Sequence, residues 1–259
     1  MNAVRKPAVA GSFYPNSAKN LQTQVNQYLK EIKPSTLPVP KAIIAPHAGY
    51  IYSGAIAASV YAMLNPNIKK VVLIGPSHRV PLKGLAASNM TSFATPLGNI
   101  PLDKKALNEI LTLPQVRVFE PAHSNEHSLE VQLPFLQTVL DDFTLIPLVV
   151  GNATPEQVGE VLEKLWGGEE TLIVISSDLS HYHDYETAQK MDKLTSQAIE
   201  NLRYEDISCD QACGYFPIQG LLHVARKLGM QAKTVDLRNS GDTAGQKNKV
   251  VGYGAYVFN

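Results

Sequence analysis

The sequence predicts an α/β fold with a central, mostly parallel β-sheet flanked by helices. Two short runs, VVLIG at 71–75 and TLIVIS at 171–176, are almost continuously apolar, as expected of strands that helices cover on both faces. Such runs alternate along the chain with segments of helical period, which is the pattern of α/β proteins. Hydrophobic residues make up 44% of the 259 residues, enough for a large core, and no linker or repeat interrupts them. We therefore predict one domain over residues 1–259.

In the first half of the chain, residue spacing predicts three helices and two buried strands. The first helix places Leu21, Val25, Tyr28 and Ile32 on one face, and a proline-rich stretch at 34–40 separates it from the first strand. Residues 79–102 lack a helical period, so we interpret them as β-structure. The predicted elements are helices at 17–32, 53–64 and 103–113, strands at 41–45 and 69–75, and β-structure at 79–102.

In the second half, two residues mark helix boundaries. Pro134 is predicted to kink or shorten a helix at 128–140, and Gly229 is predicted to stop a helix that begins at 213 or 214. The other predicted elements are a strand at 143–150, a helix at 154–165, a strand at 171–177, a helix at 184–202, and a closing pair of strands at 230–236 and 250–258.

Composition excludes several functional classes. The 23 basic and 23 acidic residues give a formal net charge of zero, so nucleic-acid binding is not expected. No apolar stretch approaches the roughly 18 residues of a membrane span, and the N-terminus lacks the apolar core of a signal peptide. We expect a cytoplasmic protein that does not bind membranes. The two cysteines, Cys209 and Cys213, are too few for a disulfide framework. We expect at least one of them to pack in the core, and the alternative is a thiolate that binds metal or acts as a nucleophile.

Histidines occur in the loops that follow three of the predicted strands. His47 follows the strand at 41–45, His78 the strand at 69–75, and His181 the strand at 171–177. Open α/β sheets build their sites at the carboxyl edge, so we expect these histidines to converge there. Two imidazoles can bind a metal together, and a third ligand is then needed from Cys, Asp, Glu or His.

Two further segments carry polar residues of interest. In SSDLSHYHD at 176–184, Asp178 can orient an imidazole or bind metal, and His181 can be a ligand or a general base. We expect His183, in the same segment, to be solvated.

NEHSLE at 125–130 opens a predicted helix. Its two carboxylates either favour the dipole at the helix N-terminus or serve the site, and His127 either supports a ligand or touches substrate. His123 and His223 are assigned to the surface or to packing.

Familiar nucleotide and hydrolase motifs are missing from the sequence. It contains no G-x-x-x-x-G-K-[ST], no G-x-G-x-x-G after a strand, no H-E-x-x-H and no G-x-S-x-G. Nucleotide-binding proteins and the commoner hydrolases are therefore disfavoured.

Six segments, in this order, resemble the Memo family. They span essentially the whole chain and read AGSFYP, IAPHAGYIYSG, GPSH, NEHSLEVQLPF, SSDLSHY and CGYFPIQG. Bacterial and archaeal members are called AmmeMemoRadiSam system protein B, in a set that includes a radical SAM protein. The family in turn resembles class III extradiol ring-cleaving dioxygenases, which use non-haem Fe(II) on an α/β sheet. The resemblance thus implies a dioxygenase-like fold and a radical SAM protein as a partner.

The same resemblance implies residue roles. It places metal ligands at His47, His78 and Cys213, a general base at His181 with Asp178 beside it, and a residue that faces the open metal position at His127. The dioxygenases have a glutamate where this chain has Cys213. A thiolate is soft and oxidisable, so ring cleavage does not follow from the ligands. Iron or copper is the expected metal, with zinc as an alternative.

Two functions of different class follow. The first is a metal-dependent redox or dioxygenase-like enzyme that acts on a small molecule. The second is a non-catalytic protein on the same scaffold that binds a peptide, a partner protein or a metal. A zinc hydrolase, which would activate a metal-bound water, is a third function with the same ligands.

Overall fold

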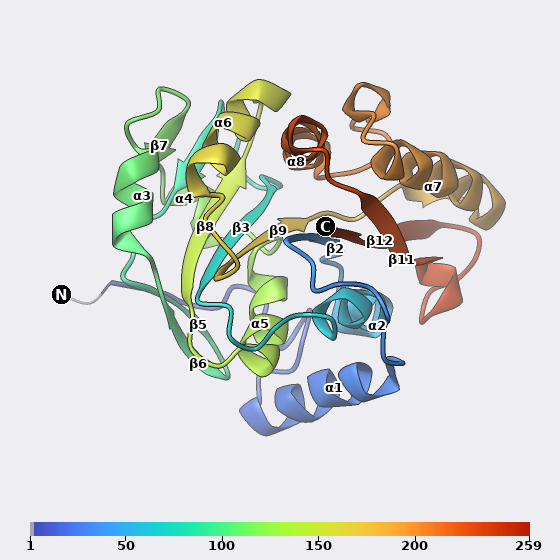
Figure 1. Ribbon diagram of the computed structural model, residues 1–259. Coiled ribbons are helices and arrows are strands. Elements are labelled where there is room, and N and C mark those ends of the chain that lie inside the picture. Colours follow the sequence, from blue (N-terminus) through green and yellow to red (C-terminus); the bar gives the residue numbers. More distant parts are fainter. Residues whose placement is uncertain (1–2) are drawn as a thin grey trace.

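The computed structural model of the protein describes residues 3–259 (Figure 1). The strands are β1 (Val4–Arg5), β2 (Ala42–Ala45), β3 (Lys70–Pro76), β4 (Leu85–Ala87), β5 (Ser92–Thr95), β6 (Gly98–Pro101), β7 (Val116–Val118), β8 (Thr144–Val150), β9 (Thr171–Ser176), β10 (His181–His183), β11 (Ala232–Asn239) and β12 (Val250–Phe258). The α-helices are α1 (Ala18–Glu31), α2 (Tyr50–Tyr61), α3 (Lys104–Ile110), α4 (Pro121–Ser124), α5 (Leu133–Val139), α6 (Pro155–Leu165), α7 (Tyr185–Glu200) and α8 (Tyr215–Leu228). Short 3₁₀ turns occupy Glu130–Gln132, Tyr204–Asp206 and Ser240–Asp242.

A nine-stranded sheet forms the centre of the molecule. Its order is β10-β12-β2-β9-β3-β8-β4-β7, and β11 also pairs with β12. The central strands β2, β9, β3 and β8 are parallel, whereas β12 and β4 join them antiparallel. A separate three-stranded sheet has the order β1-β5-β6. The predicted α/β fold with a mostly parallel central sheet is confirmed.

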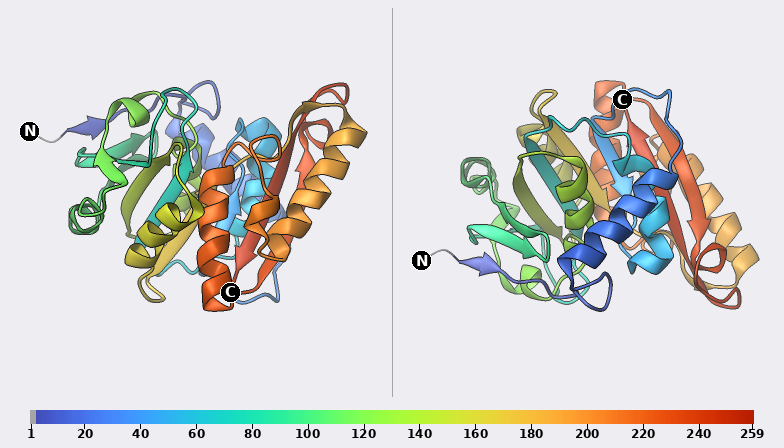
Figure 2. Two further views of the ribbon diagram at one scale, coloured as in Figure 1. Left: turned by 90° about the horizontal axis from the view of Figure 1, so that it is seen from above. Right: turned by 90° about the horizontal axis from the view of Figure 1, so that it is seen from below.

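Helices cover both faces of the large sheet. In Figure 1, α1, α2 and α5 lie below the sheet and α6 and α8 above it, and the other views show the same layers (Figure 2). Helix α8 contacts β3, β9 and α6, while α2 contacts β2, β12 and α1. The central strands are therefore buried on both sides, which explains their nearly continuous apolar sequences. Within residues 3–259, no helix combines the length and the apolar character that a membrane span requires.

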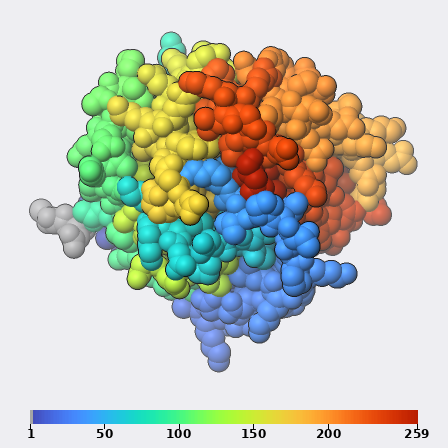
Figure 3. All heavy atoms as spheres, in the orientation of Figure 1, coloured from blue at the N-terminus to red at the C-terminus, as the bar shows by residue number. Residues whose placement is uncertain are grey.

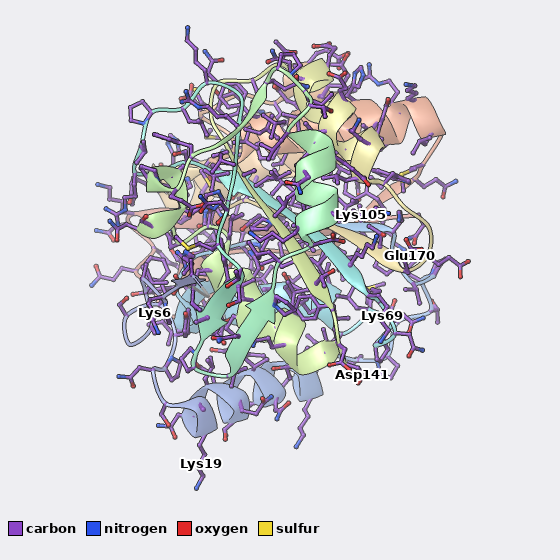
Figure 4. All side chains as sticks on the ribbon, turned by 90° about the vertical axis from the view of Figure 1, so that its left-hand side faces the viewer. Lys6, Lys19, Lys69, Lys105, Asp141 and Glu170 are labelled. Atoms are coloured by element: carbon purple, nitrogen blue, oxygen red, sulfur yellow. The ribbon has the colours of Figure 1, made fainter. Side chains whose placement is uncertain are left out.

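Figure 1 views the edge at which β2 begins and β12 ends. The backbone N–H of Lys41 donates to the carbonyl of Phe258 at 2.9 Å, and Nζ of Lys41 donates to the carbonyl of Gly168 at 2.6 Å. These segments meet at the centre of this face in the space-filling view (Figure 3). The side chains of Lys69 and Glu170 project outward from the same edge (Figure 4). The carboxyl ends of the parallel strands, and the loops that follow them, lie on the opposite side of the molecule.

The predicted elements are present, with differences at the boundaries. The largest difference concerns the helix predicted at 128–140: a 3₁₀ turn precedes α5, which begins only at Leu133. Pro134 lies in the first turn of α5, where its missing N–H leaves no hydrogen bond unmade, so it shortens the predicted helix, as one of the two expected outcomes required, and does not kink it. Helix α2 begins at Tyr50 and not at residue 53. The strands β1, β7 and β10 are two or three residues long, too short for a periodic signal.

Helices α6 and α8 approach closely because a glycine separates them. A Cβ atom at Gly220 of α8 would lie 2.3 Å from Cγ1 of Val158 in α6. The start of α6 is fixed by a capping box between Thr154 and Gln157. The end of α8 is fixed by Gly229, whose φ of 67° is left-handed. Both helices are thus fixed at one end, and a side chain between them has little room to be accommodated.

We expect Gly220→Ala to lower the free energy of unfolding. Overpacking costs about 1–3 kcal/mol, which the better helix propensity of alanine, about 1 kcal/mol, offsets only in part. Urea unfolding measures the difference. The matched control is Gly159→Ala in α6, where the nearest atom would be 3.0 Å away on His223, so its cost should be smaller. A Gly220→Ala protein as stable as the unaltered one would contradict this account of the interface.

Candidate metal centre

Three adjacent parallel strands bring the sequence-predicted histidines to one edge of the sheet. His47 follows β2, His78 follows β3, and Asp178 follows β9, which lies between β2 and β3. The ring centroids of His47 and His78 are 5.1 Å apart, and those of His78 and His127 are 4.6 Å apart. One nitrogen from each of these three rings lies within 4.8 Å of the other two. The three imidazoles form a cluster that could hold a metal ion.

The protonated nitrogen of His47 is assigned by its hydrogen bonds. Oγ of Ser176 lies 2.9 Å from Nδ1 of His47. That hydroxyl donates its one hydrogen to the carbonyl of Ser128 at 2.5 Å and accepts from Nε2 of Gln132 at 2.8 Å. It must therefore accept from His47, so Nδ1 carries the proton and Nε2 keeps its lone pair. Burial, together with repulsion from His78 and His127, holds the pKa of His47 well below its ordinary value, so the ring is neutral.

Glu126 assigns the proton of His78 in the same way. Its carboxylate accepts from Nδ1 of His78 at 2.9 Å and from the backbone N–H of His78 at 2.6 Å. It also accepts from the backbone N–H groups of His127 and Ser128, at 2.9 and 2.8 Å. Burial alone would raise the pKa of Glu126, but hydrogen bonds and charge from His78, with the N–H of Ser128, lower it to about 2. Nε2 of His78 is thus free to bind a ligand.

His127 completes the cluster from the loop before α5. Its ring is stacked on His78 and packs against Phe13 at a centroid distance of 4.8 Å. Among the residues described, its buried Nδ1 has no hydrogen-bond partner; Oε1 of Glu126 lies 3.4 Å away but is not aligned to accept. Burial lowers the pKa of His127. A neutral imidazole with a buried unpaired nitrogen is suited to a metal or a polar ligand.

Cys213 lies beside His47 but is not part of the cluster of three imidazoles. Its Sγ is 3.3 Å from Nε2 of His47, and the backbone N–H of Asp178 donates to the same sulfur at 3.3 Å. Burial, and then the charge of Asp178, raise the pKa of the Cys213 thiol well above its ordinary value. A cation at this position would convert the thiol to a thiolate. Cys209, in contrast, is exposed.

His181 and Asp178 lie in the same cleft. Nδ1 of His181 is 2.8 Å from the carbonyl oxygen of Leu179, which can only accept, so Nδ1 is protonated and Nε2 is free. Oδ1 of Asp178 accepts from the backbone N–H of His47 at 2.7 Å. Burial raises the pKa of Asp178, and the nearby His181 opposes this effect. The pair combines an imidazole with a buried carboxyl group, which is a common arrangement for proton transfer.

A cleft of about 650 Å³ opens over these groups and is lined by His47, His78, His127, Asp178 and His181. Aromatic side chains and one lysine also line it: Phe13, Tyr52, Tyr182, Tyr253 and Lys249. A second hollow of about 530 Å³ reaches Cys213 and shares His78, His181 and Tyr182 with the first. Tyr182 has a left-handed φ of 65°, a conformation that is strained for a non-glycine residue and typical of functional sites.

Comparison with known proteins decides the family. A family described as Memo-like protein matches residues 5–257. The chain belongs to the Memo family. Relatives named MEMO1 family protein are 39% identical in Aquifex aeolicus and 36% identical in Archaeoglobus fulgidus, and each match covers 98% of this chain and 99% of the relative. A third, from Methanosarcina barkeri, is 39% identical over 98% of this chain and 99% of the relative. The resemblance predicted from six short segments is confirmed.

A solved structure supports the fold of this Memo protein. It is described as the crystal structure of uncharacterized protein JW3007 from Escherichia coli K12. The TM-score is 0.54 at 13% identity, and the match covers 83% of this chain and 98% of that chain. At this identity the likeness concerns the fold alone. The dioxygenase-like chemistry implied by the resemblance stays a prediction.

Sequence reasoning missed two residues that orient His47 in the Memo centre, Ser176 and Gln132, and it left the role of Glu126 open. Glu126 was open to interpretation as a carboxylate at a helix N-terminus, but no helix begins there and its side chain is 2% exposed. Ser176 and Gln132 carried no signal. Pro134 carried a usable signal, because proline favours the first turn of a helix. A helix that starts at residue 133 leaves Glu126 in the loop before it. His183 is half-buried and not fully solvated.

His123 lies in the core, as one of its two predicted assignments required. It is 1% exposed, and its Nε2 donates to the carbonyl of Ala86 at 3.0 Å. Burial, and then repulsion from Arg5, lower the pKa of His123 from 6.5 to about 4. Between these values the unfolded chain binds a proton that the folded protein does not. The stability due to this group is therefore complete above pH 6.5 and lost as the pH falls toward 4.

We expect His123→Gln to reduce the loss of stability between pH 6.5 and 4. The amide of glutamine can still donate to Ala86, while up to about 3 kcal/mol of proton-linked destabilisation disappears. Urea unfolding at several pH values measures the slope. The control His223→Gln removes a half-buried histidine of α8 outside the centre. Equal slopes for the His123→Gln and unaltered proteins would show that His123 does not titrate in this way.

Proposed function

We propose that this Memo protein binds a metal ion through His47, His78 and Cys213 and uses it in a redox reaction on a small molecule. The observation that carries the proposal is the state of the two imidazoles. Both hold their proton on Nδ1, against Ser176 in one case and Glu126 in the other, and both present a free Nε2. Metal-binding histidines are oriented by this kind of hydrogen bond to the second nitrogen.

The separation of the donor atoms supports a shared ion. With bonds of about 2.1 Å to nitrogen and 2.3 Å to sulfur, two ligands on a tetrahedral ion are about 3.6 Å apart. Nε2 of His47 and Sγ of Cys213 are 3.3 Å apart, so one ion can contact both after a small adjustment. His127 contributes the third nitrogen of the cluster and faces either the same ion or a ligand in the cleft.

We propose iron or copper as the ion, because the proposed reaction is a redox reaction, with zinc as the alternative. Imidazole suits all three metals, and thiolate favours Cu(I) and Zn among them. When bound, such an ion supplies redox or Lewis-acid chemistry. Three protein ligands leave a coordination position open, which a purely structural zinc site does not.

The protein groups around the ion handle protons and substrate. The free Nε2 of His181 can accept a proton from a hydroxyl or a water in the cleft, and the buried carboxyl of Asp178 stabilises the imidazolium that forms. A volume of about 650 Å³ is within the range of small-molecule sites, roughly 300–1,000 Å³. A peptide ligand and a radical SAM protein partner stay predictions from the family resemblance.

We expect His47→Ala and Cys213→Ser to reduce the metal content of protein purified without oxygen. Each change removes one of the three proposed ligands, so bound iron or copper per chain should fall well below that of the unaltered protein. Elemental analysis measures it. The control is His183→Ala, because His183 lines the neighbouring hollow but is outside the cluster. Unchanged metal content in His47→Ala would refute the ligand assignment.

We expect Glu126→Gln to weaken metal binding by about 10- to 100-fold, the usual cost of losing such a supporting carboxylate. Glutamine replaces one acceptor oxygen by an NH₂ group, which only donates. Because the ring and the backbone N–H of His78 donate to different oxygens of Glu126, glutamine loses one of these two hydrogen bonds. Titration with the metal measures the affinity. The control is Glu120→Gln, since Glu120 also accepts a backbone N–H, that of Asn89, without contacting the histidines. Equal affinities for both variants would remove Glu126 from the centre.

A further inference from the structure

The segment at residues 5–14, named here the N-terminal strap, contacts two of the three loops that carry the clustered histidines, those of His47 and His127. It begins in β1, which pairs with β5, and ends before α1. None of its residues is a proposed ligand. Its contacts to the two loops come from three side chains, two backbone N–H groups and one carbonyl group.

Arg5 holds the loop that contains Glu126 and His127. Its Nη2 donates to the backbone carbonyl of Glu126 at 2.6 Å, and its Nε donates to the carbonyl of His123 at 2.9 Å. Its Nη1 donates to Oε2 of Glu130 at 2.5 Å. The planar guanidinium thus fixes three acceptors of one loop at once, in directions set by its own geometry.

The carboxylate of Glu130, in the same loop, accepts further hydrogen bonds from the strap. Besides Arg5, its carboxylate accepts from the backbone N–H groups of Ala8 and Val9, at 2.7 and 3.0 Å, and from the hydroxyl of Tyr14 at 2.6 Å. All these contacts are between residues more than 100 positions apart in the sequence. One buried carboxylate therefore connects both ends of the strap to the loop before α5.

Phe13 connects the strap to the ring of His127 and to the loop of His47. Its ring packs on His127 at 4.8 Å and lines the cleft. Its carbonyl accepts the N–H of Tyr50 at 2.8 Å, three residues after His47. The strap thereby sets the distance between the loop of His47 and the loop of His127.

Stability alone does not account for these groups. Arg5 is 5% exposed and Glu130 is 0% exposed, and replacing a buried ion pair by apolar side chains is often neutral or stabilising. An apolar pair would fill the same space, but it would leave the carbonyl groups of His123 and Glu126 without donors and their loop unheld. The ion pair is better explained by the backbone that it positions.

We propose that Arg5 and Phe13 are positioning residues of the metal centre. Arg5 holds the backbone from which the Glu126 carboxylate orients His78, and Phe13 holds the ring of His127. The inference rests on the proposed function, because it concerns the geometry of the same site. The strap then sets the positions of His78 and His127 in the centre, although it supplies no ligand.

The test uses Arg5→Lys and Phe13→Leu in the full-length protein, with Co²⁺ as the probe. Lysine keeps a positive charge beside Glu130 but cannot reach three acceptors, and leucine keeps an apolar side chain without the ring contact. We expect the dissociation constant for Co²⁺ to rise about 10-fold or more and the visible absorption spectrum of the bound Co²⁺ to shift. Should Arg5→Lys fail to fold, Phe13→Leu provides the same two measurements.

The control is Ser196→Ala in α7, outside the centre. It removes a buried hydrogen bond of 2.7 Å between the hydroxyl groups of Ser196 and Tyr256. It should lower the stability to urea and leave Co²⁺ affinity and spectrum unchanged. If the strap variants behave like this control, with lower stability but unaltered affinity and spectrum, the positioning role is overturned.

A metal-free measurement separates this proposal from the proposed function. In metal-free protein, the ring resonances of His78 and His127 in ¹H–¹⁵N NMR spectra should move in the strap variants, while those of His181 should not. If the unaltered protein binds no Co²⁺, the proposed function fails, and the ring resonances still decide the role of the strap. Resonances of His78 and His127 that do not move would overturn it.

Discussion

The parallel pairing of β9 with β2 on one side and β3 on the other is the constraint on which the centre depends. In this register Ala45 is level with Ser176, and Ile74 is level with Ile175. The loops after the three strands must therefore begin at the same height on the same edge. Because these strands lie in the middle of the sheet, with helices on both faces, neither their spacing nor their direction can change without loss of the core. The histidines are thus close together before any hydrogen bond between loops is made.

Convergence alone does not make a metal site, because a neutral imidazole can carry its proton on either nitrogen. The choice at His47 depends on Ser176, which is itself constrained by Ser128 and Gln132. The choice at His78 depends on the Glu126 carboxylate. Ser176 and Glu126 occupy the Nδ1 sides of the two rings. The Nε2 atoms of His47 and His78 are therefore the nitrogens available to the cleft that both residues line. The chemistry of the centre is therefore set one layer behind the histidines, in groups that touch neither metal nor substrate.

This division explains what the sequence could and could not predict. The strands and the loops of His47, His78 and His181 were predicted because apolar runs and the residues that follow them are local features of the sequence. Glu126 meets His78 across 48 positions, and Arg5 meets Glu130 across 125. No local pattern carries such contacts. The roles of Cys213 and His127 came from the family resemblance. The structure brings His127 into the cluster and places Cys213 beside His47, and the ligand assignment itself stays a proposal.

The distribution of charge indicates what the centre is built to receive. Arg5 and Glu130 neutralise each other, whereas the ionised Glu126 accepts hydrogen bonds from the ring of His78 and from three backbone N–H groups. A second proton on His47 is disfavoured, because burial and repulsion from His78 and His127 keep its pKa low. A buried negative charge without a cation is costly. A metal ion bound to Nε2 of His47 and His78 would place a positive charge on the lone pairs of the two imidazoles. It would also stabilise the thiolate form of Cys213. Such an ion would take the place of the second proton that burial keeps off His47.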